Sequence, residues 1–185
     1  MELQVSQRDA TRKCESKRLR REGQIPAVIY NRNQPGDTVS IDGDIFTAFL
    51  RKVKPGHLPT TIFTLKDGSN QRKAILKDIQ YHPTSYSVIH LDFEELVDDV
   101  PVNIKVPVEF TGVADSAGIK LGGVLRPVLR HVKVNCLPQD IPTHFTLDVR
   151  EMSIAENKKV RDLEIPNNVR SLVDSNQVIV VIAKR

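Results

Sequence analysis

The sequence is poor in cysteine and has no long apolar segment. Its two cysteines, Cys14 and Cys136, are far apart and form no Cys-x-x-Cys pair, so neither a disulfide framework nor a zinc site is indicated. No stretch approaches the roughly 18 apolar residues that a bilayer span needs, and the N-terminus lacks the basic-then-apolar order of a secretory signal. We therefore expect a cytoplasmic protein with reduced thiols and no membrane partner.

The signatures of common enzyme families are also missing. The sequence has no Gly-x-x-x-x-Gly-Lys phosphate loop, no Gly-x-Gly-x-x-Gly fingerprint, no His-Glu-x-x-His zinc motif and no Gly-x-Ser-x-Gly elbow. The acidic pair in residues 42–44, Asp-Gly-Asp, is too short for a calcium loop. We expect no cofactor, no metal and no catalytic activity.

The sequence is that of a mainly β protein. Hydrophobic residues make up 39% and charged residues 27% of 185 residues, close to the globular norm. Prolines and glycines separate short, often β-branched apolar runs, as is typical of strands. Helical spacing of apolar residues predicts a helix capped by Asp42 or Asp44 and running through Lys52. The predicted strands are 3–8, 27–30, 38–41, 61–65, 72–81, 88–93, 102–110, 124–136, 145–149 and 178–183.

An acidic connector at residues 94–99 indicates a domain boundary. We place the two domains at 1–95 and 96–185, with strands in both. Residues 1–95 hold 15 Lys and Arg against 12 Asp and Glu, a net charge of +3, whereas residues 96–185 hold 12 against 11, a net charge of +1. The basic function is therefore expected in the first domain, and the weak charge of the second suggests protein neighbours or a lateral contact on a larger particle.

The most basic segment runs from Arg8 to Arg21. It holds seven Lys and Arg against two acids, so its local charge of +5 exceeds the +4 of the whole chain. A possible cap at Ser16 and a glycine at position 23 predict a short helix, with the cations on one face and Leu19 opposite. Such a face suits a polyanion, and nucleic acid is the commonest one. The alternative is a solvated charged surface.

A polar surface is predicted on two strands joined near residue 84. Because side chains alternate along a strand, His90 and Asp92 share one face, and Gln80 and His82 could join them in a hydrogen-bonding platform for bases and 2′-hydroxyls. The same alternation places Leu76 on the face of Gln80. Two alternatives remain: an ordinary solvated face on which His90 pairs with Asp92, and a hydrolase that uses these two residues.

Four ordered motifs resemble the Ctc family, the family of the twenty-fifth protein of the bacterial large ribosomal subunit. They are Ser-Lys-Arg-Leu-Arg at 16–20, Ile-Pro-Ala-Val-Ile-Tyr at 25–30, Gln-Tyr-His-Pro at 80–83 and His-Leu-Asp-Phe at 90–93. The resemblance spans the chain, and residues 122–125 and 136–138 are similar to the longer, two-domain form.

The resemblance implies an N-terminal six-stranded β-barrel with short helices that binds 5S ribosomal RNA, followed by a second β-rich domain. It implies a structural component of the large ribosomal subunit, located in the cytoplasmic ribosome beside other ribosomal proteins, monomeric when free and without catalysis. A less selective RNA-binding or stress-response factor is the alternative, because the same basic segment would suit any folded RNA.

The resemblance also implies two groups of RNA-binding residues. Those expected to contact the RNA backbone and loop nucleotides are Lys13, Ser16, Lys17, Arg18, Arg20 and Arg21. Those expected on or beside the sheet surface that meets the RNA minor groove are Tyr30, Gln80, His82, His90 and Asp92. The chain departs from the family pattern at Asn31, where glycine is usual and where asparagine would tolerate a left-handed turn.

Overall fold

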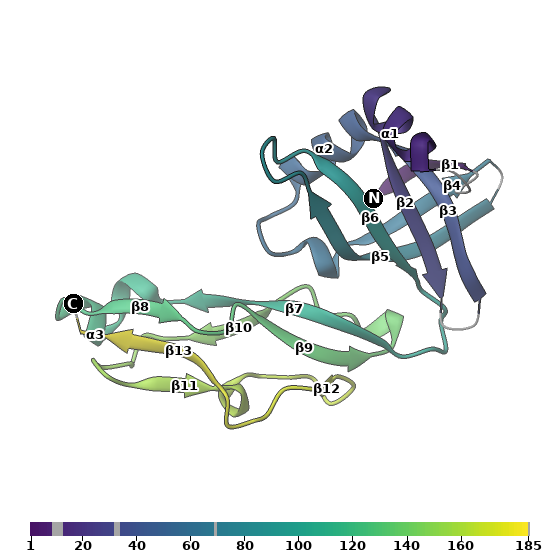
Figure 1. Cartoon of the computed structure of the whole chain (residues 1–185). Helices are drawn as coiled ribbons and strands as arrows, with labels where there is room; N and C mark the ends of the chain where they lie inside the picture. The colour runs from purple at the N-terminus through teal and green to yellow at the C-terminus, as the bar shows by residue number, and fades with distance from the viewer. Residues whose placement is uncertain (9–12, 32–33, 69, 185) are drawn as a thin grey trace. The chain divides into compact units, whose positions relative to one another are not determined.

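The computed structural model describes residues 1–8, 13–31, 34–68 and 70–184. Two compact units divide the chain, Met1–Val100 and Pro101–Arg185, and both consist mainly of strands (Figure 1). The predicted mainly β fold class is confirmed. The units meet slightly beyond residue 95, and the assignment of a separate function to each domain stays a prediction.

The N-terminal unit is a closed barrel of six strands, as expected. Around the barrel the strand order is β1-β3-β2-β6-β5-β4. The pairs β2/β6 and β1/β4 are parallel, and the other neighbours are antiparallel. Closure leaves no unpaired sheet edge. The strands are β1 (Glu2–Gln7), β2 (Gln24–Asn31), β3 (Gln34–Asp42), β4 (Ile62–Asp67), β5 (Asn70–Tyr81) and β6 (Val88–Glu95).

Alternating apolar residues fill the barrel. In β4, for example, Phe63 and Leu65 are fully buried and the residues between and beside them are not. The ring of Phe63 lies edge-on to Phe93 of β6, with 5.7 Å between ring centroids, and 6.5 Å from the ring of Phe46. Phe46 belongs to α2 (Gly43–Lys52), so this helix is packed onto the barrel core through an aromatic cluster.

The start of α2 is fixed by a cap and by a close backbone contact. Asp42 accepts hydrogen bonds from the backbone N–H groups of Asp44 and Ile45, which confirms the predicted helix and identifies its cap. The N–H of Gly43 donates to the carbonyl of Gly23 at 2.9 Å. Gly23 has a φ of +79° and ends the segment that follows α1 (Lys13–Arg21), so the two helices are joined backbone to backbone.

A bulge in β5 corrects the predicted facing of this strand. Leu76 pairs with buried Phe93 and is itself buried, whereas Asp78 pairs with half-exposed Asp92. The register shifts between Leu76 and Asp78, so one extra residue separates them. Leu76 therefore lies inside the barrel. Simple alternation placed it on the face of Gln80, and that prediction is wrong.

The C-terminal unit contains two sheets. One has four strands in the order β10-β7-β9-β12, and the other has three in the order β11-β13-β8. The strands are β7 (Val102–Thr111), β8 (Val124–Pro127), β9 (His131–Cys136), β10 (Phe145–Asp148), β11 (Asn157–Lys159), β12 (Arg170–Ser171) and β13 (Val178–Ala183). The short helices of the chain are η1 (Leu58–Thr60), η2 (Val113–Asp115), α3 (Ala117–Lys120), η3 (Pro138–Asp140) and η4 (Val160–Asp162).

The single strand predicted over 124–136 is wrong. The structure has two strands there, β8 and β9, and they belong to different sheets. Between them the N–H groups of Val128 and Leu129 both donate to the carbonyl of Ile179, so two consecutive residues share one acceptor and the ladder with β13 stops. None of the helices among the described residues is long and apolar enough to cross a membrane.

Candidate nucleic-acid interface

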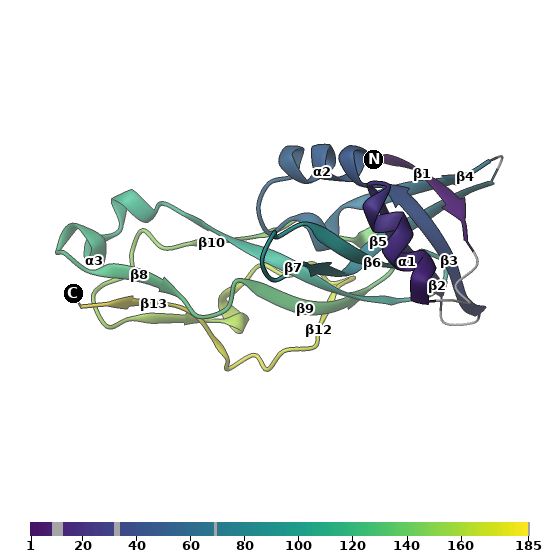
Figure 2. The ribbon, with the colours of Figure 1, turned by 45° about the horizontal axis from the view of Figure 1, so that its top comes forward.

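The predicted basic helix is present as α1. It begins at Lys13, three residues before the expected cap at Ser16, and packs against β2 (Figure 1 and Figure 2). Leu19 is half-buried, as its predicted position opposite the cations requires. The exposed cations of the helix are Lys17, Arg18, Arg20 and Arg21. Arg12 and the side chain of Lys13 lie outside the described residues.

Individual cations of α1 have different surroundings. Arg18 is 3.5 Å from Glu22, one turn further along the chain, in an exposed ion pair of the kind that contributes little to stability. Ser16 is half-buried, and its hydroxyl accepts a hydrogen bond from the guanidinium of Arg8 at 3.5 Å. Lys17 and Arg21 are exposed and lie four residues apart, on the same side of the helix.

Arg20 joins the helix to the sheet. Its Nε donates a hydrogen bond to the backbone carbonyl of Ile89 in β6 at 3.0 Å. Ile89 directly precedes His90, so this bond holds the cationic helix beside the strand that carries His90 and Asp92. The predicted cationic face of the helix is therefore attached to the barrel through one of its own cations, Arg20.

Three of the predicted sheet residues lie together on the outer face of β5 and β6. Gln80 is directly opposite His90, and the Nδ1 of His90 lies 2.7 Å from the Oδ1 of Asp92. Asp92 is also paired in register with Val28 of β2. The His90–Asp92 pair is the one that the solvated-face alternative predicted, and the pairing of Gln80 with His90 brings a carboxamide, an imidazole and a carboxylate onto one surface.

Tyr30 lies on β2 near several carboxylates. Burial raises the pKa of the Tyr30 hydroxyl above its ordinary value, and the negative charges of Glu94, Asp92 and Asp78 raise it further. Glu94 itself is paired with Lys77 at 2.5 Å. The sheet face therefore carries more carboxylates than Asp92 alone, because Asp78 is directly opposite Asp92 and Glu94 follows on the same strand.

His82 has a structural role in the turn between β5 and β6 that no sequence pattern predicted. It lies in the turn after β5, where its Nδ1 accepts hydrogen bonds from the N–H groups of Thr84 at 3.3 Å and Ser85 at 3.2 Å. These two bonds connect the His82 ring to the backbone of the turn. The same turn places Tyr86 at a φ of 55°, an unusual conformation for a residue with a large side chain.

A groove of about 470 Å³ lies between the two helices α1 and α2 and the turn that joins β5 to β6. Its walls come from the end of α1, the start of α2 and the turn between β5 and β6, and they include Arg20, His82 and Tyr86. Tyr81 and Tyr86 are 46% and 78% exposed there. No spacing rule identified these tyrosines, because their approach to α1 depends on the closure of the barrel.

Asn31 does not adopt a left-handed conformation, although asparagine would tolerate one. It ends β2, and its Nδ2 donates a hydrogen bond to Glu95 of β6 at 3.1 Å. Among the described residues other than glycine, only Tyr86 and Ala155 have positive φ angles.

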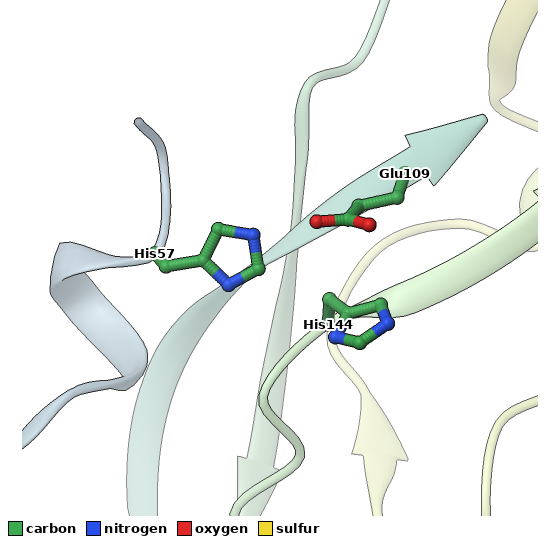
Figure 3. A group of neighbouring side chains, drawn as sticks. All are labelled: His57, Glu109 and His144. Atoms are coloured by element: carbon green, nitrogen blue, oxygen red, sulfur yellow. The ribbon is translucent and has the colours of Figure 1, made fainter. Parts of the chain in front are cut away.

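Figure 3 shows His57 of the N-terminal unit, and Glu109 and His144 of the C-terminal unit. Within the C-terminal unit, ligand atoms of Glu109 on β7 and of His144, just before β10, lie within 4.8 Å of each other. Two ligands are fewer than the three or four that protein zinc sites supply, so this pair is not assigned a metal.

Comparisons with known proteins cover both units. Residues 3–93 match the Ribosomal L25p family, and residues 101–185 match the C-terminal domain of ribosomal protein TL5. Similar proteins, each named large ribosomal subunit protein bL25, occur in Chlamydia abortus with 41% identity, Chlamydia muridarum with 40% and Chlamydia pneumoniae with 39%. Each of these alignments spans all 185 residues of this chain and the whole length of the relative.

Proposed function

The chain belongs to the ribosomal L25p family, as its motifs predicted, and from this premise we propose that it binds 5S ribosomal RNA through α1 and the outer face of β5 and β6. Proteins of this family are structural components of the ribosome and not enzymes, so the hydrolase alternative is dropped. In the proposed role the chain is part of the large ribosomal subunit, the assembly for which its relatives are named.

The contact between Arg20 and Ile89 is the observation that carries the proposal. It connects a helix with four exposed cations to a strand whose outer face holds hydrogen-bonding side chains. Cations supply affinity for phosphates without reading the sequence, whereas side chains that meet bases and sugars supply selectivity. One continuous surface with both kinds of group is suited to a structured RNA.

The shape of RNA supports the same division of roles. The major groove of A-form RNA is deep and narrow, so proteins contact phosphates, 2′-hydroxyls and the shallow minor groove. Gln80 and the His90–Asp92 pair offer both donors and acceptors on a sheet surface. The helix would then follow the phosphate backbone beside the groove that the sheet reads.

The test compares binding of the full chain to isolated 5S ribosomal RNA, transfer RNA and a mixed-sequence RNA duplex at several salt concentrations. If about five to seven phosphates are neutralised, log K for 5S ribosomal RNA falls with log salt with a slope of roughly −4 to −6. The variant Lys17→Gln/Arg21→Gln removes two exposed charges from one side of α1 and is expected to make the slope less negative by about 2.

The matched control is Arg51→Gln/Lys52→Gln, which removes two exposed charges from the last turn of α2. We expect this control to keep the salt slope of the unaltered chain. His90→Ala is expected to reduce the preference for 5S ribosomal RNA over the duplex while leaving the salt slope nearly unchanged. Equal affinity for all three RNAs would favour the less selective RNA-binding or stress-response factor.

A further inference from the structure

The four-stranded sheet of the C-terminal unit places two lysines directly opposite each other. Lys105 of β7 and Lys133 of β9 are in register, and both side chains are exposed. Side chains directly opposite on an antiparallel pair have Cβ atoms about 5 Å apart, and like charges in this arrangement are destabilising. Among the described residues, neither lysine has an acidic partner.

A third cation and two amides complete this surface. Arg170 of β12 is exposed and is opposite Asn135, which lies two residues from Lys133 along β9. From the spacings of strands and residues, the Arg170 position is about 8 Å from that of Lys133. Asn135 is in turn opposite Asn103, to which its Nδ2 donates a hydrogen bond at 2.7 Å. We name Asn103, Lys105, Lys133, Asn135 and Arg170 the cationic sheet face.

The charge of the whole unit agrees with this local pattern. When the chain is divided where the compact units meet, residues 101–185 hold 12 Lys and Arg against 9 Asp and Glu, a net charge of +3. Residues 1–100 hold 15 against 14, a net charge of +1. The net charge of +1 over residues 96–185 is lower because that range includes Asp98 and Asp99 of the acidic connector.

From this geometry we propose that the cationic sheet face binds the sugar–phosphate backbone of a ribosomal RNA segment. Uncompensated cations in register attract a line of negative charges, and the amides between them can donate to phosphate or exchange hydrogen bonds with 2′-hydroxyls. Lysine is depleted in protein–protein interfaces, which argues against a protein as the occupant. The proposal does not depend on how α1 is used.

The acids on the same sheet lie away from this surface. Glu109 is four residues from Lys105 along β7, about 13 Å, and Asp148 is on β10, where it lies 3.8 Å from Arg150. Among the residues of the strands themselves, positive charge is thus concentrated where β7, β9 and β12 are adjacent, and Asp140, just beyond β9, is hydrogen-bonded to Asn168.

The first experiment measures rebinding of the full chain to large ribosomal subunits from cells that lack it. For Lys105→Gln/Lys133→Gln we expect affinity to fall about tenfold and the slope of log K against log salt to become less negative by about 2. The matched control, Arg126→Gln/Lys184→Gln, removes two exposed cations elsewhere in the same unit and is expected to change neither quantity. If the two variants bind alike, the proposal is wrong.

The second experiment identifies the occupant. With Asn103→Cys in a Cys14→Ser background, an iron chelate tethered to the new thiol cleaves nearby RNA by hydroxyl radicals, since Cys136 is buried and escapes labelling. We expect strand cuts in ribosomal RNA. Absence of any cut in rebound subunits would mean that another class of molecule covers the face, and would overturn the proposal.

A folding measurement separates binding from a structural role. Because the two lysines repel each other, the Lys105→Gln/Lys133→Gln variant should unfold in urea at the same or a higher concentration than the unaltered chain. A clearly lower midpoint would show that the lysines stabilise the sheet, and would contradict their assignment to RNA.

Discussion

Substitution of Gly43 tests how the cationic helix is held on the barrel. A Cβ at this position would lie 2.5 Å from the carbonyl oxygen of Gly23, a contact that folded proteins essentially never show. The obstacle is backbone, so no side-chain rotation relieves it. Gly43→Ala would lose the hydrogen bond to Gly23, worth about 0.5–1.5 kcal/mol, and would add overpacking of about 1–3 kcal/mol. Together these reduce the free energy of unfolding by about 2–4 kcal/mol.

The assay is urea unfolding followed by circular dichroism, since the chain has no tryptophan. With a slope of about 2 kcal/mol/M, the midpoint should fall by about 1–2 M. Gly23→Ala is the control: it places a methyl group in open space and carries only the strain of a left-handed residue, about 1 kcal/mol. Gly43→Ala should also weaken 5S ribosomal RNA binding. A midpoint equal to that of the unaltered chain, or a larger loss in Gly23→Ala, would refute this reasoning.

Three further outcomes are expected. Phe63→Ala empties the space between the rings of Phe46 and Phe93 and should cost about 3–5 kcal/mol in urea unfolding; a loss below about 1 kcal/mol would contradict the central position of this ring. Asp42→Ala removes the cap of α2 and should cost about 1 kcal/mol, whereas Asp42→Asn should retain most of it. Because the pKa of Tyr30 is raised in the folded chain, the folded state keeps this proton longer, so stability should decline as pH rises above about 10, and Tyr30→Phe should lessen that decline.

Much of the N-terminal unit could be predicted because its signals are local. Alternation of buried residues in β1, β4 and β6 follows directly from the period of a strand, and Asp42 has the side chain and position of a helix cap. The shared face of Gln80, His90 and Asp92 was predictable for the same reason. All three lie beyond the bulge, where alternation again holds.

The rest depends on contacts between distant residues. Arg20 and Ile89 are 69 positions apart, and no rule of helix periodicity directs a guanidinium to a particular carbonyl on another element. The strands β11 and β12 have only three and two residues, so their pairing with longer partners defines them rather than their own propensity. The separation of β8 from β9 likewise follows from the bonds to Ile179.

The acidity of the sheet face beside α1 requires an explanation if that face binds RNA. Asp78 and Asp92 are directly opposite each other, so their charges oppose the approach of phosphates, whereas Glu94 is paired with Lys77. A carboxylate only accepts hydrogen bonds, and 2′-hydroxyls and exocyclic amino groups can donate to it whereas phosphates cannot. We infer that these carboxylates restrict RNA binding to sites where donors of the RNA face the sheet and phosphates face the cations of α1.

The variant Asp92→Asn separates selection from attraction. It removes one repulsive charge, so affinity for a mixed-sequence RNA duplex should stay the same or rise. It also removes a charged acceptor for 2′-hydroxyl and amino donors of the RNA, and a hydrogen bond to a charged group is worth about 1.5–3 kcal/mol, so affinity for 5S ribosomal RNA should fall about 10- to 100-fold. Competition binding with both RNAs measures the ratio directly. If both affinities rise together, the carboxylate merely opposes binding and the sheet face does not read the RNA.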